Sequence, residues 1–271
     1  MRVLNAVPPT GVCVGPRATV LASGSAGNAI LLETGDRRLL VDAGLSVEAL
    51  ERAMARVAVP VHALEAIVLT HEHDDHARGA GPLARAADVP VFVSEGTAAA
   101  TAAGLAGAGV TLFRLGHPFS IGPFTLTAFP VPHDAAEPVG FTVETAGRRI
   151  AIATDLGAAG EAIDPHLAHA DLVILESNYD LGLLHVSPYP WFLKNRILSG
   201  RGHLSNDDAA RALARTAGRR REICLVHLSE ANNLAALARD TVRAALAAAG
   251  CPADAVRAVS PNGYTNPIEI G

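Results

Sequence analysis

The sequence predicts one α/β domain, and three observations lead to this expectation. Short β-like runs alternate with helical runs along most of the chain. The 271 residues are 49% apolar and 18% charged, which supplies a large core and excludes disorder for most of the chain. Neither a solenoid repeat nor a break in composition divides the sequence. We expect a single domain over 18–271, preceded by a loosely ordered extension over 1–17.

The first predicted elements are antiparallel strands in ATVLA, AILLET and RRLLVD, separated by the turn-forming SGSAGN and TGD. A helix capped by Ser46 follows, then the strand EAIVLT, a helix in GPLARAAD and the strand VPVFVS. Next come the β-like runs FTLTAFPV, VGFTVET and RRIAIATD. The remaining elements are the strands DLVILES and EICLVH, with helices near 160–169, 189–199, 205–217 and 233–248.

One uncharged stretch, 96–113, is long enough to suggest a membrane span. It consists mainly of Ala, Gly and Thr, so we expect a small-residue helix and a turn, and no membrane association. The first residues contain prolines where a signal peptide needs an apolar run. The three cysteines form no short-spaced pair, which argues against a disulfide framework or a thiolate zinc site. These features favour a reducing, cytoplasmic location.

Polar residues of the kind that bind metals follow many of the predicted strands. This placement predicts that one rim of the sheets carries the chemistry. The residues at these strand ends are Asp42, His71, His133, Asp155, Glu176 and His227.

The densest group is THEHDDH, residues 70–76, directly after a buried strand. A solvated turn rarely needs three imidazoles, and a core could not bury them unpaired. His71 and His73 are spaced to converge on one ion as the strand ends, whereas Asp75 and His76 face a neighbouring position.

This H-x-H-x-D-H pattern resembles the signature of metallo-β-lactamase-fold hydrolases. The resemblance implies a four-layer αββα sandwich with two metal ions at one edge. It also implies that His71 and His73 share the first ion with a later histidine, and that Asp75 and His76 bind the second.

The remaining ligands are expected at other strand ends. His133 fits the later histidine, although a histidine satisfied in a turn would look the same. Asp155 fits a carboxylate that bridges the ions and holds them roughly 3.5–4 Å apart, with a helix cap as the alternative. Asp42, and Thr70 just before His71, are expected to support the ligands from behind, although a plain strand-end turn is a serious alternative for Asp42.

The tripeptide His-Leu-Ser occurs twice, at His203 and at His227. His227 follows a strand, as His71 does, and is our choice for the last ligand of the second ion. His203 lies just before a helix that Ser205 and Asp208 cap as S-x-x-D, where free N–H groups suit a phosphate. We expect His203 to touch substrate or to pass a proton to a leaving oxygen, although a surface histidine near a cap is the alternative.

Several motifs together are similar to the YycJ/WalJ group, exonuclease-like proteins of the same fold. They are SGSAGN, HDAAEP, TDLG, ESN-x-D, PWFLKNRILS, GHLSN and HLS-x-x-NN, and the similarity extends from about residue 18 to near 260. It implies a DNA substrate and 5′-to-3′ cleavage. Tyr179 stands where the group's pattern suggests histidine, which places any metal role there in doubt.

Candidate substrate contacts lie in loops near these motifs. The SGSAGN loop could cradle a phosphate or form an ordinary hairpin turn. Lys194, the single lysine of the chain, and Arg196 are the best local cations for a nucleic-acid backbone, whereas Arg201 fits a solvated helix face better. The serines and asparagines of these loops could contact substrate or could equally be ordinary helix-capping residues. The predicted contacts are Ser25, Asn28, Lys194, Arg196, His203, Ser205, Asn206 and Asn233.

These assignments predict a two-metal phosphodiesterase acting on nucleic acid, with Asp75, Asp155 and His203 as catalytic residues. A hydroxide bridging two ions would attack phosphorus, with Asp75 as ligand and proton acceptor. Both manganese and zinc suit the donors. The formal charge of −5 argues against a broad nucleic-acid-binding face, but two divalent ions would add four positive charges in one cleft. The alternatives are hydrolysis of a cyclic phosphodiester, a thioester or a lactone, and a metal-bound regulatory module without turnover.

Overall fold

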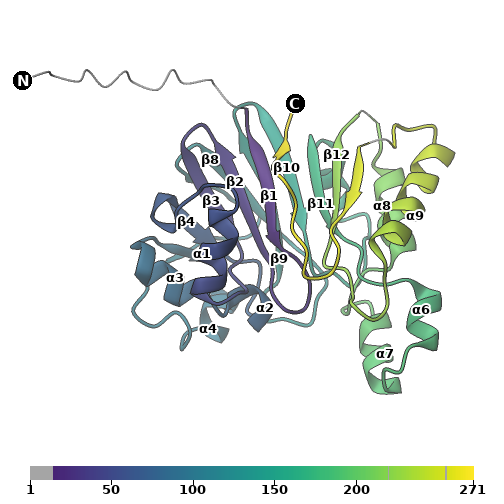
Figure 1. The fold of residues 1–271 in the computed structure, drawn as a ribbon, viewed down its shortest axis with the longest axis horizontal. Helices are drawn as coiled ribbons and strands as arrows, with labels where there is room; N and C mark the ends of the chain where they lie inside the picture. Colours follow the sequence, from purple (N-terminus) through teal and green to yellow (C-terminus); the bar gives the residue numbers. More distant parts are fainter. Residues whose placement is uncertain (1–14, 219, 254) are drawn as a thin grey trace, which may run out of the picture.

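A computed structural model describes residues 15–218, 220–253 and 255–271, and shows two seven-stranded sheets (Figure 1). In order across the first sheet, the strands are β14 (Ile268–Glu269), β1 (Arg17–Ala22), β2 (Ala29–Thr34), β3 (Arg37–Val41), β4 (Ala66–Val68), β5 (Val91–Val93) and β6 (Val110–Leu112). Across the second sheet they are β13 (Val256–Ala258), β12 (Glu222–Val226), β11 (Leu172–Glu176), β10 (Arg148–Ala153), β9 (Val139–Thr145), β8 (Phe124–Pro130) and β7 (Pro118–Ile121).

The helices of the described ranges are mostly short. They are α1 (Val47–Ala55), the 3₁₀ helix η1 (Val61–Ala63), α2 (Asp74–Ala77), α3 (Ala80–Ala87), α4 (Glu95–Ala100), α5 (Asp164–Ala168), α6 (Leu181–Val186), α7 (Trp191–Leu198), α8 (Asn206–Arg215) and α9 (Ala235–Ala248). None of them is long and apolar enough to cross a membrane.

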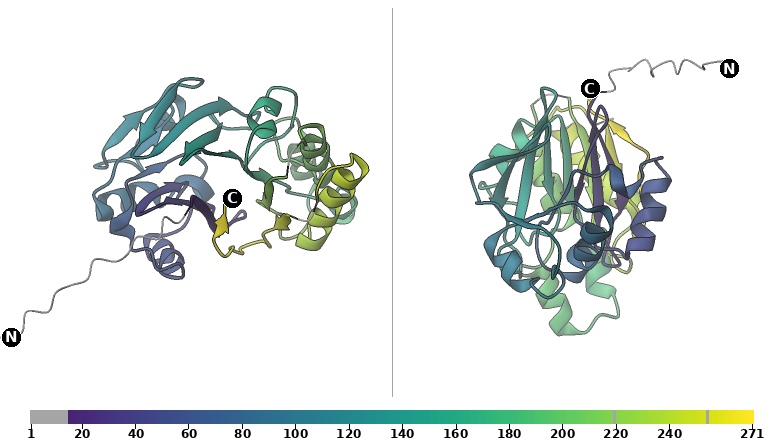
Figure 2. Two further views of the ribbon diagram at one scale, coloured as in Figure 1. Left: turned by 90° about the horizontal axis from the view of Figure 1, so that it is seen from above. Right: turned by 90° about the vertical axis from the view of Figure 1, so that its left-hand side faces the viewer.

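The layers follow from the alternation of side chains along each strand. Leu39 of β3 and Ile150 of β10 point into a core between the two sheets. Leu40, one residue further along β3, points instead toward helices α1 and α3 on the outer face. Ala151 points toward α5, α8 and α9 on the outside of the second sheet. The resulting αββα sandwich, seen from two further sides in Figure 2, confirms the predicted fold.

Most predicted elements are present in the described part of the chain. The opening strands β1, β2 and β3 are antiparallel, and Ser46 caps α1 by accepting a hydrogen bond from the backbone N–H of Ala49. The small-residue stretch forms α4 followed by turns. β1 already begins at Arg17, one residue inside the predicted extension, and residues 1–14 lie outside the described ranges.

The sequence-based prediction missed α6 and the two- to four-residue strands β7, β13 and β14. Such short strands give too few residues for a two-residue alternation to stand out. α6 did have a sequence signal, because Asp is a common helix cap. Asp180 caps this helix: its side chain accepts a hydrogen bond from the N–H of Leu183. Together α6 and α7 project from the body of the sandwich below α8 and α9 in Figure 1.

Candidate metal centre

Three histidines, His71, His73 and His133, form a group that could hold one metal ion, which we call the first ligand set. One ring nitrogen from each lies within 4.8 Å of the others, and His133 Nε2 is 3.3 Å from His73 Nδ1. His133 Nδ1 lies 3.0 Å from the Gly202 carbonyl, and His71 Nδ1 lies 3.0 Å from the Thr70 hydroxyl. These outer contacts orient the rings so that the other nitrogens of His71 and His133 face the shared space.

Asp75, His76 and His227 form the second ligand set, and their donor atoms also lie within 4.8 Å of one another. Carboxylates hold both imidazoles from behind: His76 Nδ1 is 2.7 Å from Asp42 Oδ2, and His227 Nδ1 is 2.9 Å from Glu176 Oε1. Asp42 and His227 have φ angles of 61° and 55°, which residues other than glycine rarely adopt. Such strain is found where the surrounding structure fixes a functional side chain.

Asp155 follows β10 and lies between the two ligand sets. Its Oδ2 is 2.9 Å from His76 Nε2. Its Oδ1 is 3.2 Å from His227 Nδ1 and 3.8 Å from His133 Nε2 of the first set. A carboxylate in this position can contact ions held by either set, which is the geometry that a bridging ligand needs.

Unpartnered buried atoms show that these residues fit divalent cations. His71 Nε2 and His227 Nε2 are buried and lack a hydrogen-bond partner. Leaving such atoms unsatisfied costs about 1–3 kcal/mol each, and bound cations would remove that cost. Burial and the neighbouring His76 hold the pKa of His71 well below its ordinary value, which keeps its imidazole in the neutral form that binds metals.

The carboxylate of Asp155 also has the charge state of a ligand. Burial alone would raise its pKa, but the charges of His227 and His76 outweigh burial and hold the pKa well below its usual range. With nitrogen and carboxylate oxygen donors at both sets, the site suits zinc or manganese chemically.

Glu176 is the main residue that the sequence-based site lacked. It is buried at the end of β11, and its Oε1 lies 2.7 Å from His203 Nδ1 as well as 2.9 Å from His227 Nδ1. Its Oε2 accepts hydrogen bonds from the N–H groups of Leu156 and Leu204. The same carboxylate therefore orients both His-Leu-Ser histidines. Its place at a strand end was the available signal.

His203 differs from His227 in being partly exposed. Its side chain is 21% accessible and lines a cavity of about 230 Å³, whose wall comprises Ser25, Asn178, Tyr189, Leu193, Arg196, Ile197, His203 and Ser229. Burial lowers the pKa of His203, but the adjacent Glu176 carboxylate outweighs burial and raises it above its ordinary value. His203 can therefore carry a proton at the edge of an accessible cavity.

The predicted cations lie on α7 and beyond it. Arg196 lines the cavity and pairs with Asp134, with 2.6 Å between Nε and Oδ2. The Lys194 ammonium donates a hydrogen bond to the His185 carbonyl. Arg201 donates two hydrogen bonds to the carbonyl of His133, so it supports the loop of a ligand instead of facing only solvent.

Asn28 is buried, and its polar atoms bond within the protein. Its Oδ1 accepts a hydrogen bond from the N–H of Gly24, and its Nδ2 lies 3.2 Å from Asp75 Oδ2. The backbone of Asp75 also packs against Gly44, where a Cβ would overlap it. These contacts favour positioning of Asp75 over the substrate contact that the sequence predicted for Asn28. Ser25, from the same loop, does line the cavity.

Ser205, Asn206 and Asn233 are likewise buried and engaged. Ser205 caps α8 by accepting a hydrogen bond from the N–H of Asp208. Asn206 Nδ2 donates to Asn233 Oδ1, and Asn233 Nδ2 donates to Asn206 Oδ1 and to two backbone carbonyls. Because the polar groups of these three side chains already form hydrogen bonds within the protein, a structural role is favoured over the predicted substrate contact. Tyr179 is also buried, packs against Leu184, and burial raises its pKa to about 12.

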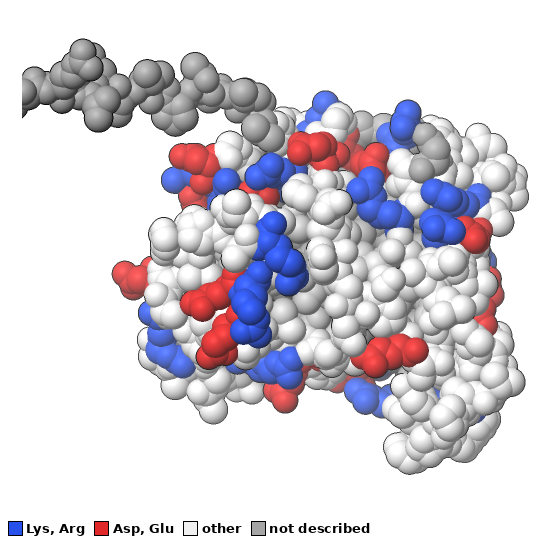
Figure 3. All heavy atoms as spheres, in the orientation of Figure 1, with Lys and Arg blue, Asp and Glu red and all other residues white. Residues whose placement is uncertain are grey.

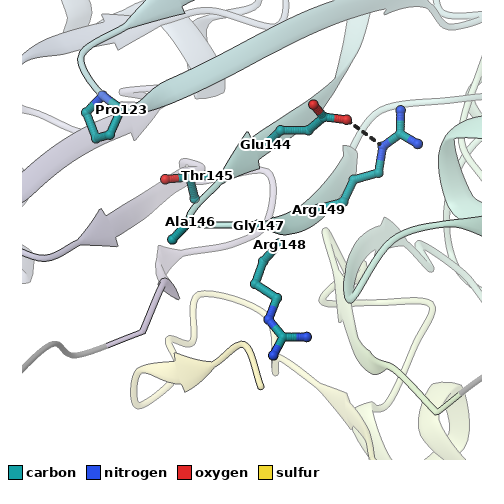
Figure 4. A pocket seen from close by; sticks show the side chains of 7 residues that line it. All are labelled: Pro123, Glu144, Thr145, Ala146, Gly147, Arg148 and Arg149. Atoms are coloured by element: carbon teal, nitrogen blue, oxygen red, sulfur yellow. Dashed lines mark ion pairs between the residues drawn. The ribbon is translucent and has the colours of Figure 1, made fainter.

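A second hollow, of about 370 Å³, lies at the β9–β10 hairpin around Arg148 and Arg149 (Figure 4). This hairpin is at the opposite end of β10 from Asp155. Figure 4 shows Glu144 and Arg149 joined as an ion pair there, with Nε and Oε1 3.5 Å apart. The described metal ligands contribute nothing to this hollow, so we separate it from the site.

The comparisons with known proteins agree with this geometry. A family model described as a beta-lactamase superfamily domain matches residues 37–228. The chain is 37% identical to exodeoxyribonuclease YycJ of Bacillus anthracis over 233 residues, which cover 84% of this chain and 88% of that protein. It is 36% identical to exodeoxyribonuclease WalJ of Streptococcus pneumoniae over 235 residues, covering 84% and 87%.

Among solved structures, the metallo-β-lactamase fold protein YhfI of Bacillus subtilis superposes with a TM-score of 0.70 at 21% identity, over 93% of this chain and 99% of that one. This likeness supports the fold. The family match spans the strand ends from Asp42 to His227. The chain therefore belongs to the metallo-β-lactamase-fold family, in which it is a metal-dependent hydrolase similar to YycJ and WalJ.

Proposed function

We propose that the protein is a two-metal phosphodiesterase that removes nucleotides from the 5′ end of DNA in the cytoplasm. The observation that carries this proposal is the pair of ligand sets on either side of Asp155, beside a cavity lined by His203. The names of the two exodeoxyribonuclease relatives support nucleic acid as the substrate class.

In this proposal each ligand set would hold one divalent ion, and Asp155, which lies near nitrogens of both sets, would serve as a ligand shared between them. When bound, the two ions supply a water of lowered pKa and stabilise negative charge on the phosphoryl oxygens. Asp75 acts as a ligand and proton acceptor, and Asn28 fixes its carboxylate by the contact to Oδ2. Asp42 and Glu176 keep His76 and His227 turned toward the ions.

His203 donates the proton that the leaving oxygen needs. Glu176 engages Nδ1, so Nε2 is the atom left to deliver a proton to a group in the cavity. The raised pKa of His203 favours its protonated form near neutral pH. This arrangement separates the two His-Leu-Ser histidines, because His227 serves the second ion and His203 serves the substrate.

The size of the cavity supports action at a strand end. At about 230 Å³ it is smaller than the 300–1,000 Å³ that is typical of pockets for drug-sized ligands. A duplex cannot enter it, whereas the terminal unit of a strand presents a phosphate and a sugar that can. Arg196 on the cavity wall is available to a phosphate when its ion pair with Asp134 opens.

Digestion of end-labelled DNA tests this function. Purified, metal-stripped protein receives manganese or zinc separately and is mixed with single- or double-stranded DNA labelled at the 5′ or the 3′ end. We expect the 5′ label to be released early as mononucleotide and the 3′ label to remain on progressively shorter strands. Asp155→Ala, prepared in parallel, controls for contaminating nucleases. Absence of cleavage with either ion would overturn the nuclease assignment and favour a small-molecule ester or phosphodiester substrate.

A further inference from the structure

The projecting α6–α7 region exposes two aromatic side chains at the start of α7. Trp191 is 70% exposed and Phe192 is 75% exposed. Trp191 is the single tryptophan of the chain, and the other six phenylalanines are buried or partly buried. Tyr264 is also exposed, at 58%, but the Arg56 guanidinium covers its ring at 4.3 Å. Two adjacent exposed aromatic side chains on α7 therefore indicate a contact outside the protein.

These aromatic residues adjoin the catalytic cavity. α7 contributes Leu193, Arg196 and Ile197 to the wall that also contains His203. Phe192 is four residues before Arg196, so the two side chains share a face of the helix. A ligand that leaves the cavity along this face of α7 would pass Phe192, and Trp191 is the neighbouring residue at the start of the same helix.

The charge of this segment favours a polyanion. Residues 187–203 contain Lys194, Arg196 and Arg201 and no acidic residue, in a chain whose formal charge is −5. The acidic partner of Arg196 is Asp134, from the loop after β8. The rest of the α6–α7 region is mostly uncharged, as the white surface at the lower right of Figure 3 shows. Flat exposed rings beside cations are the combination that single-stranded nucleic-acid sites use, because rings stack on bases and cations follow the backbone.

We propose that Trp191 and Phe192 form a stacking platform for unpaired bases of a DNA single strand whose 5′ end occupies the cavity. The proposal rests on the proposed nuclease function and sharpens it, because bases within a duplex cannot stack on side chains without being unpaired. The platform positions the strand; it takes no part in bond breaking. It predicts preference for single-stranded ends over blunt ones.

Trp191 itself provides the test, because the intrinsic tryptophan fluorescence of the chain comes from this one residue. The full-length, metal-loaded protein is titrated with a hydrolysis-resistant phosphorothioate oligothymidylate of about 12 nucleotides. We expect saturable quenching of the emission. An abasic strand of the same length and charge should bind roughly 5- to 150-fold more weakly and quench little, because each stacked base contributes appreciably to affinity. Equal quenching by both strands would overturn the platform.

Variants distinguish base stacking from protein binding by the α6–α7 region. In anisotropy measurements with labelled single strands, Phe192→Ala should weaken binding roughly 5-fold or more, while Phe192→Tyr keeps most of the affinity. Val186→Ala, on α6 and 81% exposed, is the matched apolar control and should leave binding unchanged. Equal losses at Val186 and Phe192, or a change of oligomeric state in Trp191→Ala, would overturn the proposal in favour of a protein-binding face.

The two proposals can fail separately. DNA cleavage without quenching or a Phe192 effect would remove the platform and leave the nuclease. Quenching and a Phe192 effect in a protein that cleaves no DNA would remove the nuclease activity and leave a single-strand-binding surface.

Discussion

The two ligand sets lie side by side around Asp155, but partners of different charge hold them. In the first set, His71 and His133 contact a hydroxyl and a backbone carbonyl, both neutral. In the second set, His76 and His227 contact the carboxylates of Asp42 and Glu176. A carboxylate makes the imidazole a more basic ligand, and it also attracts a proton to that imidazole when no metal is bound.

This difference teaches that similar histidines at one sheet edge need not bind equivalent ions. Burial lowers the pKa of His71 and His133, so an ion at the first set meets two imidazoles that are ready to bind. An ion at the second set must displace protons but gains stronger electrostatic attraction. We therefore expect different affinities and different pH responses, and each experiment below tests one part of that contrast.

Asp155→Ala should have the largest effect, because it removes the group shared by both sets. We expect no detectable turnover and reduced metal content, since Asp155 lies within 3.8 Å of nitrogens from both. Elemental analysis of purified protein measures the ions, and circular dichroism verifies the fold. A variant that kept both ions and full activity would rule out the bridging role.

His203→Ala should have the next largest effect and should leave both sets intact. His203 is outside them, so two ions should remain bound while turnover falls about 10²- to 10⁴-fold through loss of the proton donor. The matched variant His227→Ala should lose one ion. If the two outcomes were exchanged, with His203→Ala losing an ion and His227→Ala keeping both, our assignment of the two His-Leu-Ser histidines would be reversed.

The contrast between the two sets also marks what sequence could predict. THEHDDH brings its donors together within one loop after one strand, so the residue types and their spacing indicated the ligands. The strand ends indicated the rim on which His133, Asp155 and His227 converge, because sheet geometry follows from local alternation. The αββα layers followed from the family resemblance carried by these motifs.

Roles that depend on distant partners were beyond sequence reasoning. Glu176 acts on His203 and His227, which lie 27 and 51 residues further along the chain. Asn28 and Asn233 occupy loops and Asn206 begins α8, positions at which the same amide could face either substrate or protein. Only the packing around them shows that they face inward, because a loop asparagine has no periodic pattern that reports its direction.

Glu176→Gln should weaken metal binding at the second set by about 10- to 100-fold, because the glutamine side chain removes the charge behind His227. Thr70→Val removes the neutral hydroxyl behind His71. The same hydroxyl donates to Asp42 behind His76, so we expect a smaller loss that is largest at the first set and also reaches the second. Competition with a chromophoric chelator measures both affinities. Equal losses in the two variants would remove the distinction between charged and neutral support.

Mild acid should weaken metal binding at the second set first. Burial lowers the pKa of His76 and His227, but Asp155 and the carboxylates behind the rings outweigh burial; the pKa of His76 is well above its ordinary value and that of His227 is about 10. In the metal-free protein these rings therefore hold protons at neutral pH, and an ion must displace them. Lowering the pH makes displacement harder, by up to about tenfold in affinity per pH unit for each proton released.

The first set should respond less, because the pKa of both His71 and His133 is below its ordinary value, burial being the main cause. His227→Ala, which retains the complete first set, and His133→Ala, which retains the complete second set, allow each position to be measured separately. Each variant is dialysed at a series of pH values between 8 and 6. We expect His133→Ala to lose the ion of its second set at a higher pH than that at which His227→Ala loses the ion of its first set. Loss at the same pH in both variants would mean that the carboxylates behind the second set do not bring protons into competition with the metal.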